Sequence, residues 1–169
     1  MLGRYENFPA TIHKRAFFIT PLSGKALQQK LVRIINGING KTYSLEDIAA
    51  PSVRDCSVTF ECGIAEANDF NYMDKEETSK VLKNLRKKPL QTMDFFFAIR
   101  YYKTQNEKRT PLRFDYYMVR LMFTTSTVET QVVHERGPRH LSPQDLVNFI
   151  VNSVNGTSPK KTLKQSEPS

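Results

Sequence analysis

The chain has 169 residues, with 25 Lys and Arg against 17 Asp and Glu, which gives a net charge of +8, and 39% of its residues are apolar. This length suits one domain, and the apolar share is enough for a sizeable core without disulfide bonds. The longest apolar run, residues 95–99, is far too short to cross a bilayer, and residues 1–10 hold no apolar stretch typical of a secretory signal. We therefore expect a soluble cytoplasmic protein, or a nuclear one in a eukaryotic cell, without a membrane partner.

The first half of the chain alternates between strand and helix patterns. Residues 12–19 predict a strand, and residues 23–38 predict a helix because their apolar side chains follow a helical period. Alternating apolar and polar residues predict a second strand over residues 55–64. Residues 74–87 predict a second helix, since Asp74, with a glutamate three residues later, is typical of a capping box.

Three strands then follow one another closely. They cover residues 93–102, 112–123 and 128–136, and the tight connection between the last two is typical of a hairpin. Residues 142–155 give the clearest helix signal in the chain. Ser142 stands before a proline and three residues before an aspartate, which predicts a capping box, and a glycine follows the last apolar position.

This order of elements predicts the fold class. Consecutive strands with short connections pair antiparallel, and helices inserted between them pack on the sheet. We therefore predict a single α+β domain over residues 1–156, with a mostly antiparallel sheet of about five strands and helices packed mainly on one face. Residues 157–169 are rich in Ser, Pro and Lys, which predicts a disordered polar and basic tail.

The cysteines and histidines give no metal or redox signature. Cys56 and Cys62 lie six residues apart on one predicted strand, roughly 20 Å from each other, so they are too far apart for a disulfide bond. We expect two buried, reduced thiols. No Cys-x-x-Cys pair is present, and the spacing of His134 and His140 matches no zinc motif, so we predict neither a metal nor a cofactor.

Aromatic and cationic residues are interleaved on the three consecutive strands. On the first of them, alternation places one apolar set on the core side and Phe96, Arg100 and Tyr102 on the other side. Tyr116 and Arg120 share a side of the next strand. An open face with these rings and guanidinium groups, together with Arg136, could stack bases and neutralise phosphates. The alternative is a core covered on both faces, with arginine stems that reach the solvent.

The segment 134–140 is a second candidate. It holds two histidines and two arginines just before a predicted helix start, where backbone N–H groups favour anions, so it could bind phosphate. The alternative is a solvated turn in which Glu135 pairs with an arginine. Together with the strand residues, the candidate binding residues are Phe96, Arg100, Tyr102, Tyr116, Arg120, His134, Arg136, Arg139 and His140.

These features favour a binding protein over an enzyme. The basic excess attracts polyanions, so the leading hypothesis is a small protein that binds RNA or single-stranded DNA through the aromatic and arginine face. The alternative is a non-catalytic structural or adaptor subunit of a larger complex, or a homo-oligomer, because Tyr, Phe, Met and Arg are also enriched at protein interfaces. An enzyme with an anionic substrate is a third possibility, for which the sequence shows no catalytic motif. A nucleic-acid face should be strongly positive, whereas a subunit interface should be apolar at its centre.

Overall fold

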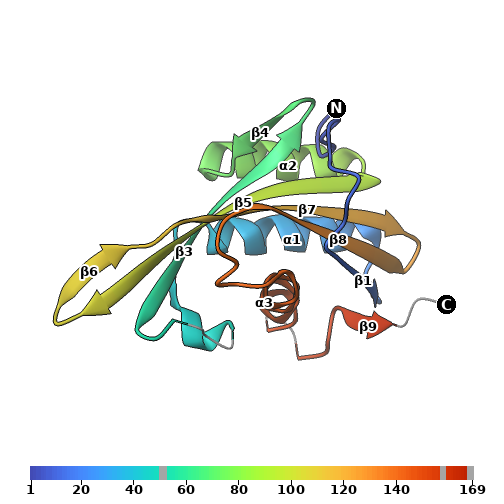
Figure 1. Cartoon of the computed structure of the whole chain (residues 1–169). Helices are drawn as coiled ribbons and strands as arrows, with labels where there is room; N and C mark the ends of the chain where they lie inside the picture. The colour runs from blue at the N-terminus through green and yellow to red at the C-terminus, as the bar shows by residue number, and fades with distance from the viewer. Residues whose placement is uncertain (50–52, 157–158, 167–169) are drawn as a thin grey trace.

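The computed structural model describes residues 1–49, 53–156 and 159–166. Over these ranges the chain forms one α+β domain with three helices and nine strands, all joined in one sheet (Figure 1). The helices are α1 (Gly24–Ile38), α2 (Lys75–Lys87) and α3 (Pro143–Asn155). The strands are β1 (Lys14–Ile19), β2 (Thr42–Ser44), β3 (Cys56–Glu66), β4 (Asp69–Tyr72), β5 (Thr92–Gln105), β6 (Lys108–Pro111), β7 (Asp115–Thr124), β8 (Thr127–Arg136) and β9 (Lys164–Ser166).

The sheet is antiparallel between all its named neighbours. Its order is β2-β3-β5-β7-β8-β1-β9, and β4 and β6 add to β3 and β5. The five predicted strands correspond to β1, β3, β5, β7 and β8, but a count of about five is too low. The additional strands have only three or four residues each, too few for a period-two pattern. Pairing with a long neighbour, which no local pattern reveals, makes them strands.

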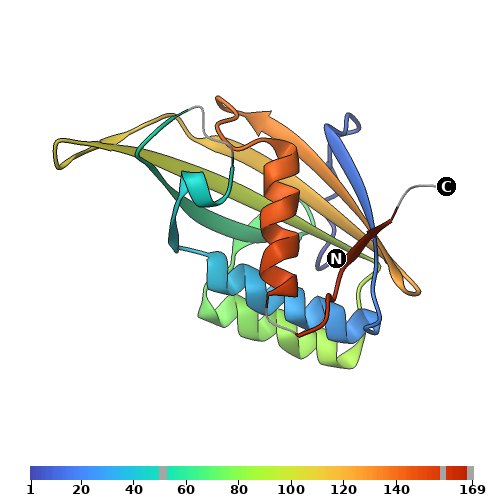
Figure 2. The same cartoon turned by 90° about the horizontal axis from the view of Figure 1, so that it is seen from below.

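One face of the sheet packs against helices α1 and α3. The apolar set of β5, Phe95, Phe97, Ile99 and Tyr101, is at most 1% exposed, as its alternation predicts. Leu146, Ile150 and Val154 of α3 are buried as well, and Figure 2 shows this helix crossing under the sheet. Burying each of those three α3 side chains contributes about 1.5–3 kcal/mol, which fixes α3 to this face.

Helix α2 lies alongside α1 and packs mainly on it (Figure 2). Its buried side chains are Thr78, Val81 and Leu85. Gln28 of α1 is fully buried, and its amide both donates to and accepts from the backbone of Leu90, at 2.6 and 2.8 Å. A buried amide must find such partners. This pair therefore fixes the connection from α2 to β5 against α1.

The N-terminus of α3 has the predicted capping box, whereas its C-terminus lacks the predicted glycine cap. The Ser142 hydroxyl accepts from the Asp145 N–H, and the Asp145 carboxylate accepts from the Ser142 N–H, both at 3.1 Å, so the capping box is present. Gly156 follows the helix with φ −67°, so the left-handed conformation of a glycine C-cap is not adopted.

The prediction of a disordered tail is wrong for residues 159–166. Strand β9 pairs with β1, and Thr162 and Leu163 are buried. The side chain of Asn155, at the end of α3, accepts from the N–H groups of both buried residues and donates to the carbonyl of Leu163. One apolar side chain and one amide therefore anchor a segment whose composition is polar. The remainder of the predicted tail, residues 157–158 and 167–169, lies outside the described ranges.

Both cysteines point into the core and are not bonded to each other. Burial raises the pKa of the Cys62 thiol strongly and that of Cys56 to a lesser extent, so neither is a thiolate near neutral pH. We expect the native protein to react slowly with a thiol reagent such as dithiodipyridine, and the protein unfolded in guanidinium to react rapidly with two equivalents. Rapid labelling of both thiols in the native protein would contradict the buried position of β3.

Candidate functional site

The face of the sheet opposite α1 and α3 carries a different set of side chains. Asp94 and the rest of the outward set on β5 lie beside outward residues of β7, because Asp94 pairs with Arg120, Phe96 with Met118 and Ala98 with Tyr116. None of the helices in the described ranges covers the centre of this face. We call it the open face. Its half-buried apolar members are Phe17, Phe70, Phe96, Phe114, Tyr116, Met118 and Met122.

Aromatic rings form a continuous row across the open face. Phe96 lies between Phe70 of β4 and Tyr116 of β7, with ring centroids 5.5 and 5.9 Å apart, and Phe114 continues the row 6.0 Å from Tyr116. Tyr5 of the N-terminal segment covers the other end, 4.7 Å from Phe70. These distances are those of tilted aromatic pairs in contact. The centre of the open face is therefore an apolar ridge, which we call the aromatic ridge.

Guanidinium groups already stack on two of the three rings that the sequence offered to bases, Tyr102 and Tyr116, and on Phe114. Arg136 lies 4.4 Å from the centroid of Tyr116, and Arg109 lies 3.8 Å from that of Tyr102. Arg100 approaches the Phe114 ring at 5.2 Å. Each contact is a cation–π arrangement, which stabilises by about 0.5–1 kcal/mol at an exposed site. A base could stack on these rings only by displacing an arginine.

Carboxylates neutralise part of the positive charge of the open face. Arg100 pairs with Glu61 at 2.9 Å, and Arg15 pairs with Glu129 at 3.3 Å. Arg120 makes two parallel bonds of 2.8 Å to Asp94, whose side chain is fully buried. The three pairs leave much of the face with little net charge.

The N-terminal segment explains why Asp94 is buried on a face without helices. The N–H of Tyr5 donates to the Asp94 carboxylate at 2.7 Å, and Arg120 donates to the carbonyl of Tyr5 at 3.1 Å. The Arg120 guanidinium also lies 4.3 Å from the Phe8 ring. Arg120, a predicted binding residue, therefore holds the N-terminal segment on the sheet and is not free for a ligand.

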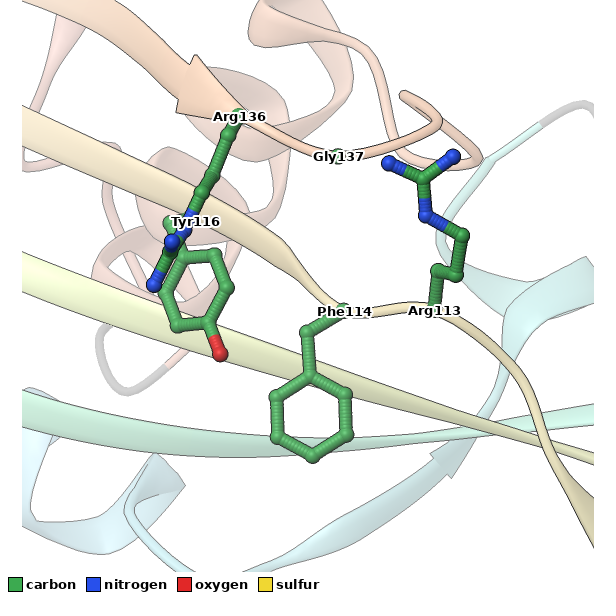
Figure 3. A pocket seen from close by; sticks show the side chains of 5 residues that line it. All are labelled: Arg113, Phe114, Tyr116, Arg136 and Gly137. Carbon is green, nitrogen blue, oxygen red and sulfur yellow. The ribbon is translucent and has the colours of Figure 1, made fainter.

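A hollow of about 310 Å³ opens at the Phe114 end of the aromatic row. It is lined by Arg113, Phe114, Tyr116, Arg136 and Gly137 (Figure 3). Figure 3 shows the Arg136 side chain lying along the Tyr116 ring, with Arg113 on the other side of Phe114. Neither Arg113 nor Arg136 forms an ion pair within the described ranges. Sequence reasoning missed Arg113 and Phe114, although alternation placed Phe114 beside Tyr116.

Arg136 reaches the open face through an irregularity in β8. Simple alternation places it on the side of Val132, which is in the core. The register shifts between Tyr116 and Tyr117, so that Tyr117 pairs with His134 and Tyr116 with Arg136. Glu135 is thus an extra residue, and a bulge of this kind turns the following side chain to the other face.

His134, Arg139 and His140 do not join the open face. They surround the buried Asp115 at the start of β7, whose carboxylate contacts His134 Nε2 at 2.8 Å and accepts from the N–H groups of Arg139 and His140 at 2.7 and 3.1 Å. The Tyr101 hydroxyl is a fourth partner at 2.5 Å. The N–H groups that could have held a phosphate in this segment are therefore occupied by Asp115.

Gly137 makes this arrangement possible. It has φ +120°, and a Cβ there would lie 2.3 Å from the Phe114 carbonyl and 2.4 Å from Asp115 Oδ1. Only glycine combines that backbone conformation with such a close approach. The segment 137–141 consequently packs directly over Asp115, and the same glycine forms one wall of the hollow.

Comparisons with known proteins give no further information, since no family model, no curated protein and no solved structure matches this chain. Within the described ranges no three His, Cys, Asp or Glu side chains are grouped so that they could hold a metal ion. No helix in the same ranges is long and apolar enough to cross a membrane.

Proposed function

We propose that this protein is a non-catalytic subunit of a protein assembly and that the open face is its protein interface. The observation that carries the proposal is the aromatic ridge, which lies at the centre of a helix-free sheet face with its charged groups around it. Protein interfaces combine an apolar core rich in Phe, Tyr, Met and Arg with a polar rim. Contiguous half-exposed apolar side chains of this kind are uncommon on a surface that meets only water.

Base stacking, the leading expectation from the sequence, is less well supported at this face. The rings of Tyr102 and Tyr116 are occupied by guanidinium groups, and Arg100, Arg120 and Arg15 are paired with carboxylates. Counterion release from a polyanion needs cations that are free to reach phosphates. The pattern therefore favours a protein partner over a single-stranded nucleic acid here.

The side chains that line the hollow indicate which chemical group the partner places there. Arg113 and Arg136 line an opening of about 310 Å³ together with the rings of Phe114 and Tyr116. A carboxylate is the group that arginine binds most specifically, through two parallel hydrogen bonds. We therefore expect the partner to place an aspartate or glutamate at the hollow and apolar side chains along the ridge.

The test is site-specific photo-crosslinking in cells that produce the protein naturally. Benzoyl-phenylalanine in place of Phe96 or Tyr116 keeps an aromatic side chain on the open face, and the same residue in place of Asn84, exposed on α2, is the matched control. We expect the two face positions to capture one protein, or a second copy of this chain, and the control position to capture neither. Crosslinks to nucleic acid, or equal products at all three positions, would contradict the proposal.

A charged substitution then measures the strength of the interface. Met118→Asp places a carboxylate on the ridge without touching the buried core, so it should weaken the captured complex by at least about 2 kcal/mol, or roughly thirtyfold in Kd. Ser79→Asp on the exposed side of α2 should leave the Kd unchanged. Calorimetry or size-exclusion chromatography with the identified partner checks both values.

A further inference from the structure

The β5–β6 hairpin projects from the body of the molecule and is not needed for its core. Figure 1 shows this arm extending beyond the sheet, and every residue from 104 to 111 is exposed. The arm carries Lys103, Lys108 and Arg109, and its tip carries Glu107. A segment that buries nothing contributes little to folding, so its shape and charge need another explanation.

The arm is a firm ribbon that is three-stranded at its root, where β3 pairs with β5 as far as Lys103, and two-stranded beyond that residue. Four residue pairs join β5 and β6, from Tyr102 with Pro111 to Gln105 with Lys108, and a two-residue loop closes the end. Asn106 and Glu107 in this loop have φ 51° and 64°. Positive φ at both central residues is the signature of the tight hairpin turn that matches the natural strand twist. The arm therefore presents its side chains in a fixed arrangement.

Cations point to both sides of this ribbon. Arg109 pairs with Thr104 and stacks on Tyr102, so it lies on the side of the open face. Lys108 pairs with Gln105, one position along, and therefore lies on the opposite side together with Lys103. A flat anionic partner would need cations on one side only. Cations on both sides match a groove that has negative charge on each wall.

The nearby carboxylates do not cancel this charge. Lys103, Lys108 and Arg109 form no ion pair within the described ranges. Glu107 is at the turn, beyond the cations, and Asp55 meets the root of the arm through its backbone carbonyl, which accepts from the Thr104 N–H at 2.8 Å. Arg113, two residues after β6, extends the positive surface toward the hollow.

We propose that the arm binds double-stranded DNA by entering its major groove. That groove is about 12 Å wide and admits a two-stranded ribbon, whose strands lie about 4.8 Å apart. Lys103 and Lys108 on one side and Arg109 on the other then face the phosphates of opposite walls. Residues 103–110 of the arm include no apolar side chain to anchor a protein partner, which separates their chemistry from that of the aromatic ridge. This proposal is independent of the protein interface, since it uses different residues.

The experiment is fluorescence anisotropy of the full chain with a labelled DNA duplex of about two helical turns over a series of salt concentrations. The arm variant K103A/K108A/R109A and the control variant K83A/K87A/K88A on α2 each remove three positive charges, which lowers the net charge from +8 to +5. We expect the slope of log affinity against log salt to fall by about 2.7 in the arm variant, at about 0.9 per phosphate contact, and to change by less than about 1 in the control. Circular dichroism confirms that both variants fold.

Three results would overturn the arm proposal. They are absence of duplex binding at low salt, an equal loss of slope in the α2 control, and polyglutamate that competes as strongly as the duplex. Equal affinity for a single strand of the same length would overturn the groove assignment. Met118→Asp should bind the duplex like the wild type, so the protein-interface proposal and the arm proposal can fail separately.

Discussion

Replacing Asp115 by asparagine is expected to lower the free energy of unfolding by about 3–5 kcal/mol. The Asp115 side chain is fully buried and has four partners: Tyr101, His134, Arg139 and His140. The Arg139 Nε–H donates to His134 Nδ1 at 3.2 Å. Nδ1 therefore carries no hydrogen, and in the neutral ring the hydrogen is on Nε2, which donates to Asp115.

All four partners of Asp115 are thus donors, and a carboxylate is the side chain that accepts from four donors without offering one. An asparagine of the same shape accepts on its oxygen but turns an NH₂ group toward two donors. A buried donor left without an acceptor has given up its hydrogen bond to water and gains none in return, which costs about 1–3 kcal/mol. Asp115→Asn should therefore lower the free energy of unfolding nearly as much as Asp115→Ala does, although it replaces only one carboxylate oxygen by an NH₂ group.

Urea unfolding followed by circular dichroism measures this loss, which suits a chain without tryptophan. Glu61→Gln is the matched control, since Glu61 is a carboxylate paired with Arg100 at the surface, and its replacement should cost less than about 1 kcal/mol. An Asp115→Asn protein within 1 kcal/mol of the wild type would mean that the four donors find other partners.

Strand alternation was the most informative signal in the sequence. It separated Phe95, Phe97 and Ile99, which are buried, from Phe96 and Arg100, which lie on the open face. Alternation is a local property of one strand, so it can be assigned from the sequence without knowing which strands are its neighbours. What it could not predict is which strands would be neighbours or which short segments would join the sheet edges.

The 134–140 segment shows where local reasoning fails. Its histidines and arginines suggest an anion site, yet the anion they surround is Asp115, a residue of the same chain about 20 positions earlier. One signal was present in the sequence, because alternation puts Asp115 on the buried side of its strand with Tyr117. A carboxylate on a core position needs buried donors, and a nearby segment rich in N–H donors is a natural source.

The position of Arg136 depended on a feature without a clear sequence signature. The extra residue Glu135 reverses the alternation at the end of β8 and moves Arg136 beside Tyr116. The N-terminal cover over Arg120 is equally non-local, since it depends on contacts between Tyr5 and residues about 90 to 115 positions away. Both features change which arginines are available, which is why composition alone favoured a more positive face than the structure presents.

Stability is expected to fall steeply above pH 10. Burial raises the pKa of Tyr101 and Tyr117 well above the ordinary value near 10, and burial also raises that of Tyr43. In the unfolded chain these hydroxyls ionise near pH 10, whereas in the folded protein they stay protonated. Above pH 10 the folded state therefore binds more protons than the unfolded state, and each added pH unit favours unfolding. Cys62, whose pKa burial also raises, starts the decline near pH 8.5–9.

Each group whose folded-state pKa lies well above the working pH and whose unfolded-state pKa lies well below it should remove about 1.4 kcal/mol of stability per pH unit. With Cys62, Tyr101 and Tyr117 together, we expect a loss of about 3 kcal/mol between pH 10 and 11, because the unfolded tyrosines are only half ionised at pH 10, and full stability below about pH 8. Urea unfolding at half-unit steps from pH 7 to 11 measures the slope, and tyrosine absorbance near 295 nm reports ionisation directly. Tyr117→Phe removes one titrating hydroxyl and should reduce the loss between pH 10 and 11 by about 1 kcal/mol. If stability is unchanged between pH 10 and 11, or if all seven tyrosines ionise near pH 10 while the protein remains folded, the hydroxyls of Tyr101 and Tyr117 are not held protonated in the core.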